Sequence, residues 1–143
     1  MREILFRGKA KAIAGCPYNN GKPDGEWVFG YVFSDLGAMK IRQYETDRPE
    51  CNDYEVDPET VGQYTGLTDK NGVKIFEGDI VSLVKHDSLI YKVVYVPCRY
   101  ELVNSKGVNC FVLDIYKSEN IEVIGNIHDN PELLGGENNG INR

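Results

Sequence analysis

The residues able to do acid–base or nucleophilic chemistry are few and far apart. The chain has two histidines, His86 and His128. His128 precedes Asp129, but neighbouring residues on a strand face opposite sides of a sheet, so this adjacency favours a structural role over an acid–base pair. A hydrolase that uses Cys98 with His86 or His128 is a third-ranked hypothesis, because nothing in the sequence singles out a set of partners. We therefore predict no catalytic residue and no enzyme.

The sequence also lacks the spacing that metal and phosphate sites require. Asp69-x-Asn71-Gly72 resembles the middle of a calcium loop, but Leu67 falls on the first ligand position and Gly78 where the bidentate glutamate belongs. No glycine-rich loop continues into Gly-Lys-Ser/Thr. The cysteines form no close pair of the zinc or redox type, and stand at Cys16, Cys51, Cys98 and Cys110. No metal and no cofactor are predicted.

Acidic side chains are concentrated in one segment. Residues 45–60 hold seven acids and one base, and so carry the whole formal charge of −6 of the chain. A solvated surface loop is the simpler interpretation. The functional alternative is an electrostatic docking patch for a basic partner. Its candidate partner-binding residues are Glu50, Asp53, Glu55, Asp57 and Glu59.

Length and charge limit the class of protein. A chain of 143 residues makes one domain or two small ones. No run is apolar enough for a membrane helix and no signal peptide opens the chain, so we expect a cytoplasmic protein with reduced thiols. An acidic chain without a basic stripe is a poor candidate for nucleic-acid binding. That alternative would need tyrosines for base stacking and one basic face, with these candidates: Tyr91, Tyr95, Tyr100, Arg2, Arg7, Lys9, Lys11, Lys92 and Arg99.

The elements that must position these residues are short strands. Residues 26–33 form an aromatic and β-branched run, which predicts a strand buried on both faces or one with Gly30 at a bulge. A turn at residues 34–37 joins it to a strand at 38–44. Residues 16–25 are a predicted loop. Further strands are expected at 2–7, 80–84, 89–96, 100–103, 108–116 and 121–127.

Residues 56–80 hold the densest turn chemistry. Asp57 and Pro58 are typical of the cap and first position of one helical turn. Asn71-Gly72 predicts a tight turn that joins 63–67 to 73–76 as a hairpin. A second tight turn is expected at 77–79. The glycines of this stretch are interpreted as positions that need positive φ or close backbone approach.

No helical pattern exceeds about two turns, so the fold class is all-β (mainly β). We predict short-stranded sheets, an SH3-like barrel in the C-terminal half and minimal helix. The expected domains are residues 1–54, with the acidic loop, and 55–134, the small barrel, followed by a disordered tail at 135–143. One compact unit over 1–134 is the alternative.

Three segments resemble the YopX family of small phage and prophage proteins. Residues 55–81 resemble its central signature, and residues 1–8 and 121–134 resemble its two ends, so the likeness extends over 1–134. Gly8-Lys9-Ala10 departs from the aromatic–acid pair that members more often have. The signature residues are Asp57, Pro58, Thr60, Gly62, Gln63, Tyr64, Thr65, Gly66, Asp69, Gly72, Glu77, Gly78 and Asp79.

The resemblance implies a β-rich fold, a bacterial or phage cytoplasmic setting and self-association, and it implies no reaction. We therefore expect a non-enzymatic phage accessory protein, a homo-oligomeric β-barrel module that binds a host or phage protein. The alternative is a small-barrel protein that binds nucleic acid in phage DNA metabolism or regulation. No membrane partner is expected.

Overall fold

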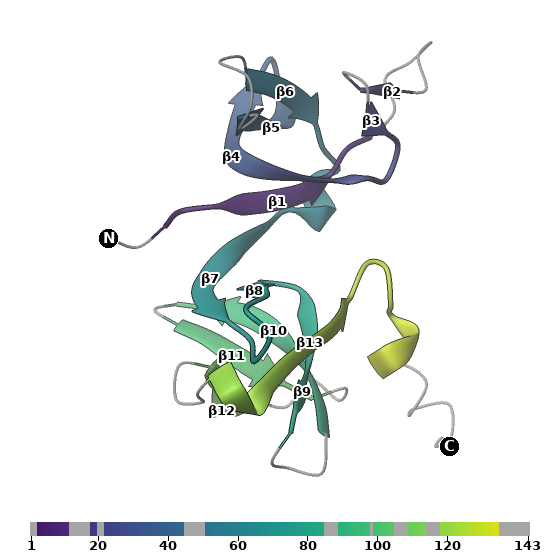
Figure 1. The fold of residues 1–143 in the computed structure, drawn as a ribbon. Coiled ribbons are helices and arrows are strands. Elements are labelled where there is room, and N and C mark those ends of the chain that lie inside the picture. Colours follow the sequence, from purple (N-terminus) through teal and green to yellow (C-terminus); the bar gives the residue numbers. More distant parts are fainter. Residues whose placement is uncertain are drawn as a thin grey trace. The chain divides into compact units, whose positions relative to one another are not determined.

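The computed structural model describes residues 3–11, 18–19, 22–44, 51–84, 89–97, 99–104, 109–113 and 118–134 (Figure 1). The chain divides into two compact units, residues 1–64 and 65–143. Strands make up most of the described residues, so the all-β class is confirmed. The domain boundary predicted at residue 54 falls within β6 (Cys51–Glu55), which belongs to the first unit. The predicted tail, 135–143, lies outside the described residues.

The first unit is built on one antiparallel sheet. The strand order is β6-β5-β4-β1, and the first residues of β7 (Gly62–Thr68) pair with β1, with Arg7 opposite Gly62. Tight turns join neighbouring strands, as at Leu36 and Gly37, where φ is 51° and 83°. The bounds of the other main strands are β1 (Phe6–Lys9), β4 (Trp27–Asp35) and β5 (Ala38–Tyr44).

The inner face of this sheet holds the core of the first unit. Cross-strand alternation brings apolar side chains to one side, because residues two apart on a strand share a face. Bonds from Lys11 N to Glu55 O (3.1 Å) and from Asp57 N to Lys9 O (2.9 Å) bring the chain after β6 against β1. The buried core residues are Ala10, Val28, Ile41, Tyr54 and Val56.

Three local predictions for the first unit need correction. The run at 26–33 is not buried on both faces: Val28 is fully buried, whereas Phe29 is 41% exposed. Gly30 allows the backbone of β5 to approach β4 closely, since a Cβ at this position would overlap the carbonyl oxygen of Arg42. Part of the predicted acidic loop is strand β6, because its backbone pairs with β5. Within the predicted loop at 16–25, β2 (Tyr18–Asn19) and β3 (Lys22–Pro23) pair with each other.

The second unit contains a five-stranded antiparallel sheet in the order β12-β11-β10-β9-β13. The register of β13 against β9 shifts between Val123 and Gly125. Among the described strands the order runs from β12 to β13 without closing, so the predicted SH3-like barrel is not shown. The bounds are β8 (Lys74–Phe76), β9 (Asp79–Leu83), β10 (Leu89–Val96), β11 (Arg99–Val103), β12 (Asn109–Val112) and β13 (Ile121–Asn126).

Apolar side chains from most of these strands form a separate core. Leu67 and Val123 pack against this core from β7 and β13. Short helical turns occur at η1 (Pro58–Thr60) and η3 (Ser118–Asn120), in agreement with the predicted minimal helix. No described helix is long and apolar enough to span a membrane. The buried core residues are Ile75, Val81, Leu83, Tyr91, Val93, Leu102, Leu113 and Ile121.

Candidate functional site

The first part of the signature stretch satisfies backbone groups of the first unit. Asp57 caps η1, and its Oδ1 accepts a hydrogen bond from Glu59 N (3.1 Å), as predicted. The Thr60 hydroxyl donates to Asp57 O (2.7 Å) and accepts from Lys9 N (2.8 Å). The signature residues Asp57, Pro58 and Thr60 therefore fasten the segment before β7 to β1.

The middle of the stretch forms the predicted hairpin of β7 and β8. The buried Thr65 hydroxyl donates to Ile75 O on β8 (2.8 Å) and accepts from Leu67 N (3.2 Å). Gly66 and Gly72 have φ of 90° and 81°, which a side chain would strain. The hairpin prediction is confirmed, and these residues are explained by backbone geometry.

Asp69 is a buried carboxylate that holds three backbone amides. Its Oδ1 accepts from Asn71 N (2.8 Å) and Val73 N (2.9 Å), and its Oδ2 accepts from Val123 N on β13 (2.9 Å). Burial alone raises the pKa of Asp69, but these three amides, with Lys70 nearby, lower that pKa below its ordinary value. Asp69 thus joins the hairpin turn to the last strand. The signal for this role is an aspartate two residues before Asn71-Gly72.

Asp79 performs a similar task at the second predicted turn. Its side chain is 2% exposed and its Oδ2 accepts from Phe76 N (2.7 Å). Gly78, at φ 92°, donates its N–H to Val93 O (2.9 Å). Most of the signature is accounted for by turns, caps and buried hydrogen bonds. These bonds and turns do not account for four signature residues: Gly62, Gln63, Tyr64 and Glu77.

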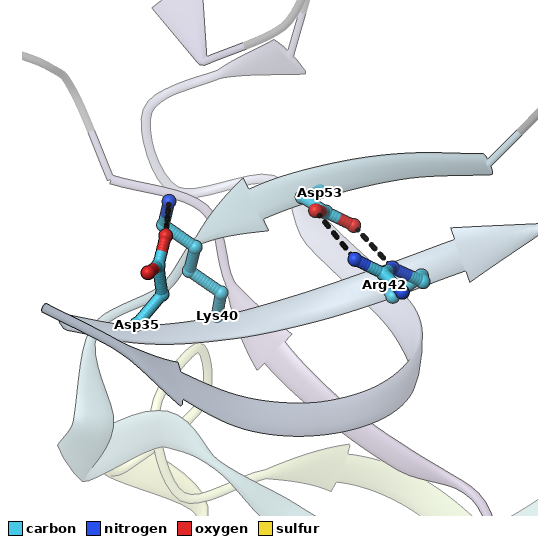
Figure 2. Close-up of polar contacts among 4 residues, drawn as sticks. All are labelled: Asp35, Lys40, Arg42 and Asp53. Atoms are coloured by element: carbon cyan, nitrogen blue, oxygen red, sulfur yellow. Dashed lines mark hydrogen bonds and ion pairs between the residues drawn. The ribbon is translucent and has the colours of Figure 1, made fainter.

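Two of the acids predicted to bind a partner, Asp53 and Glu55, pair with cations of the first unit. Arg42 donates its Nε and Nη2 to the two carboxylate oxygens of Asp53 (2.8 and 3.0 Å), across β5 and β6 (Figure 2). This hydrogen-bonded arginine lowers the pKa of Asp53, against an opposing effect of burial. Glu55 pairs with Lys11 (3.2 Å). Glu59 is exposed, and Glu50 lies outside the described residues.

The residues considered for acid–base chemistry have structural contacts where they are described. The Asn126 Oδ1 accepts from both His128 N and Asp129 N (2.9 Å each), and its Nδ2 donates to Asp129 (3.1 Å). His86 lies outside the described residues, as do Cys16 and Cys98. In the part of the chain that the structure describes, no group of three or more histidine, cysteine, aspartate or glutamate side chains is placed to hold a metal ion.

The outer face of the first unit carries a feature that the sequence did not reveal. Trp27, Phe29, Tyr31 and Phe33 occupy alternate positions of β4, so they point away from the core. Phe29 is 41% exposed and Tyr31 is 56% exposed, whereas Val28, which precedes Phe29 and faces the other side of the sheet, is fully buried. Half-exposed aromatic rings in sequence along one strand are uncommon on a surface that binds nothing.

Each ring of this row has a basic residue directly opposite on a neighbouring strand. On β1, Lys9 pairs with Trp27 and Arg7 pairs with Phe29. On β5, the pairs are Arg42 with Tyr31 and Lys40 with Phe33. We call these eight residues the aromatic–cation face: Arg7, Lys9, Trp27, Phe29, Tyr31, Phe33, Lys40 and Arg42.

The cations also contact the rings. The Arg7 guanidinium lies 4.6 Å from the Trp27 ring centroid, and the Lys9 ammonium lies 5.4 Å from it. The Arg42 guanidinium lies 5.1 Å from the Phe33 centroid. Cation–π contacts of this length hold a charge over a ring. Arg7 is buried, at 8% exposed, whereas Lys9 and Arg42 are partly exposed. The face is therefore apolar along its middle and positive on both sides.

Two of the four cations also pair with acids. Lys40 Nζ lies 3.0 Å from Asp35 Oδ2, and this hydrogen bond raises the pKa of Lys40 despite the opposing effect of desolvation (Figure 2). Arg42 pairs with Asp53, as described above. On the β5 side the positive charge is thus partly compensated by Asp35 and Asp53, and this bears on what the face can bind.

The basic face proposed from the sequence is only partly assembled. Arg7 and Lys9 lie together beside Trp27, but Arg2 is outside the described residues. Lys92 and Arg99 belong to the second unit. Tyr91 is buried there, and Tyr95 and Tyr100 form an edge-to-face pair with centroids 5.3 Å apart. The contribution that sequence reasoning missed comes from Lys40 and Arg42.

Comparison with known proteins agrees with this fold. The family model described as YopX protein matches residues 31–135. The chain belongs to the YopX family. This YopX chain is also similar to a solved structure, the crystal structure of protein EF1440 from Enterococcus faecalis, at 25% sequence identity and a TM-score of 0.55. The match covers 94% of this chain and 99% of EF1440. None of the curated proteins matches the chain.

Proposed function

We propose that this YopX chain is a non-enzymatic accessory protein of a phage or prophage, which acts in the bacterial cytoplasm by binding. The aromatic–cation face is the observation that carries the proposal. A core-forming sheet needs one apolar side, and the first unit has that side in Val28, Ile41 and Val56. The outer rings of β4 lie on the other side of the sheet from that core, and exposed aromatic side chains that lie next to one another favour a binding surface.

A binding role also accounts for the distribution of chemistry along the chain. The signature residues Thr65, Asp69 and Asp79 satisfy backbone groups, so they support a scaffold. The outer face of β4 presents side chains that interfaces favour, since aromatic residues and arginine are enriched at binding hot spots. In this proposal the signature residues stabilise the fold, and the outer face of β4 with its neighbouring strands binds the ligand.

Self-association is part of the proposal, as the family resemblance implies. Light scattering on the full chain should give a particle heavier than the 16.1 kDa of one chain. A monomer at every concentration would remove the oligomer from the proposal and leave the binding face to be tested by substitution.

The binding face is tested by a double variant, Phe29→Ser with Tyr31→Ser. Capture from a lysate of phage-infected bacteria is compared for the wild type, the double variant and a control, Leu36→Asn. Leu36 is fully exposed at the hairpin tip of the same unit and has positive φ, which asparagine tolerates. We expect the double variant alone to lose the material that the wild type retains. Equal recovery by all three proteins would contradict the proposed face.

A further inference from the structure

The aromatic–cation face repeats one chemical unit along β4. At each of four successive outward positions, one aromatic ring stands beside one cation, which is on β1 for the first two rings and on β5 for the last two. Outward positions on a strand recur about every 6.8 Å, twice the rise per residue. The face therefore presents a row of ring-plus-cation units, and their spacing is similar to the distance between successive units of an extended polymer.

A single-stranded polynucleotide supplies the complementary unit. Every nucleotide carries one flat base and one phosphate, so it can stack on a ring while its phosphate meets a cation. Stacking of bases on aromatic side chains beside a basic groove is the general mode of binding to single strands, and it tolerates any sequence. Phe29 and Tyr31 are the rings with the most surface available for stacking.

We propose that this face binds single-stranded DNA or RNA, with bases stacked on Phe29 and Tyr31 and phosphates held by the partly exposed cations of the neighbouring strands, Lys9, Lys40 and Arg42. The inference rests on the proposed function, since it names the ligand of the proposed face. A protein ligand fits less well, because it would have to desolvate the three partly exposed cations, Lys9, Lys40 and Arg42, without a regular supply of further anions. The net charge of −6 argues against tight binding of the whole chain, but the local field at the face decides contact with phosphate.

The acids next to the aromatic–cation face lead to a further testable consequence of the proposal. Asp53 occupies the Nε and Nη2 groups of Arg42, and Asp35 pairs with Lys40. Both carboxylates compete with phosphate for these cations. We expect Asp53→Asn and Asp35→Asn each to strengthen binding by about 3- to 10-fold and to steepen its salt dependence, because one more phosphate contact becomes favourable.

The experiment is an anisotropy titration of the full chain with labelled oligo(dT) and oligo(rU) of about 12 nucleotides, at about 50 and 200 mM salt. The informative substitution is Phe29→Leu, which keeps an apolar side chain and removes the flat ring. Phe29→Tyr keeps the ring and serves as the rescue. Leu36→Asn is the control on the same unit, and circular dichroism confirms that each variant is folded.

We expect salt-sensitive binding of the wild type and a loss of affinity of about 5- to 150-fold for Phe29→Leu, from the usual free energy of one stacked base. Phe29→Tyr and Leu36→Asn should bind as the wild type does. Lys9→Gln should reduce the slope of log K against log salt by about 0.7, the value for one contact with a single strand.

Two outcomes would overturn the inference: no binding that weakens with salt, or equal binding by wild type and Phe29→Leu. In one combination of results, the oligonucleotides show no binding while the Phe29→Ser, Tyr31→Ser variant no longer captures a protein or no longer self-associates. In that case the aromatic–cation face is a binding surface, but its ligand is not a nucleic acid. If that double variant also behaves as the wild type, the proposed function fails together with the inference.

Discussion

Replacement of Asp69 should destabilise the second unit in two distinguishable steps. Asp69→Asn keeps one acceptor oxygen for the turn amides of Asn71 and Val73. Its amide nitrogen, however, is a donor, and it would face the N–H of Val123, which is also a donor. Asp69→Ala removes all three acceptors. A hydrogen bond to a charged group contributes about 1.5–3 kcal/mol. We therefore expect a cost of about 2 kcal/mol for asparagine.

Asp69→Ala should destabilise the second unit more than Asp69→Asn does, but by less than three full hydrogen bonds. Asn71 and Val73 are exposed, so water can replace part of what their amides lose. Val123 is half-buried on β13, and its amide loses most. The expected total for Asp69→Ala is about 3 kcal/mol, against a typical stability of 5–15 kcal/mol.

Urea unfolding followed by far-UV circular dichroism measures these costs, and native-state hydrogen exchange localises them. The Val123 amide should lose protection in both variants. Glu122→Gln is the matched control, since its pair with Lys70 at 3.5 Å is about 40% exposed and should be worth less than ~0.5 kcal/mol. A cost below ~1 kcal/mol for Asp69→Ala, or unchanged exchange at Val123, would refute the reasoning.

The pH dependence of this difference has a definite sign. The folded pKa of Asp69 is lowered, so the unfolded chain takes up a proton first as the pH falls. The advantage of the wild type over Asp69→Asn should be complete above the ordinary aspartate pKa of about 3.9. It should shrink as the pH falls below that value toward the folded pKa.

Three further outcomes are expected. Gly30→Ala should destabilise the first unit by about 3 kcal/mol, because a Cβ would overlap the Arg42 carbonyl oxygen; Trp27 fluorescence in urea measures this, and a neutral effect would contradict the close approach. Thr65→Val should cost about 1–2 kcal/mol, since it leaves a buried carbonyl without its donor; urea titration with unchanged midpoint would contradict it. The Arg42–Asp53 pair should persist below pH 3.9, because the pKa of Asp53 is lowered; NMR titration of the Asp53 carboxyl at its ordinary value would contradict it.

Local turn chemistry made the signature stretch predictable. Asn71-Gly72 and the Asp57-Pro58 cap act over three or four residues, so the sequence alone determines the hairpin and η1. The hydrogen bond between Val123 N and the Asp69 carboxylate joins residues that are 54 positions apart in the sequence, so it can be seen only in the folded structure. The local sequence indicates only a turn around Asp69, whereas in the structure its carboxylate also binds the backbone of β13.

The candidate site was hidden for a different reason. A continuous apolar run fits a strand buried on both faces as well as a strand with an aromatic outer face, so 26–33 was ambiguous. The cations come from β1 and β5, and only the register places Arg7 opposite Phe29 and Arg42 opposite Tyr31. Strand β6 was missed because its acids are typical of a loop, whereas Asp53 is stabilised on the strand by Arg42.

Photo-crosslinking tests the central claim most directly. A single-stranded oligonucleotide with a photoreactive thymine is irradiated with the full chain, and mass spectrometry identifies the crosslinked peptide. The account predicts crosslinks on the peptide that contains β4, at Phe29 or Tyr31, and their loss in high salt. Crosslinks confined to the second unit, or none above the level of the Phe29→Ser, Tyr31→Ser variant, would contradict it.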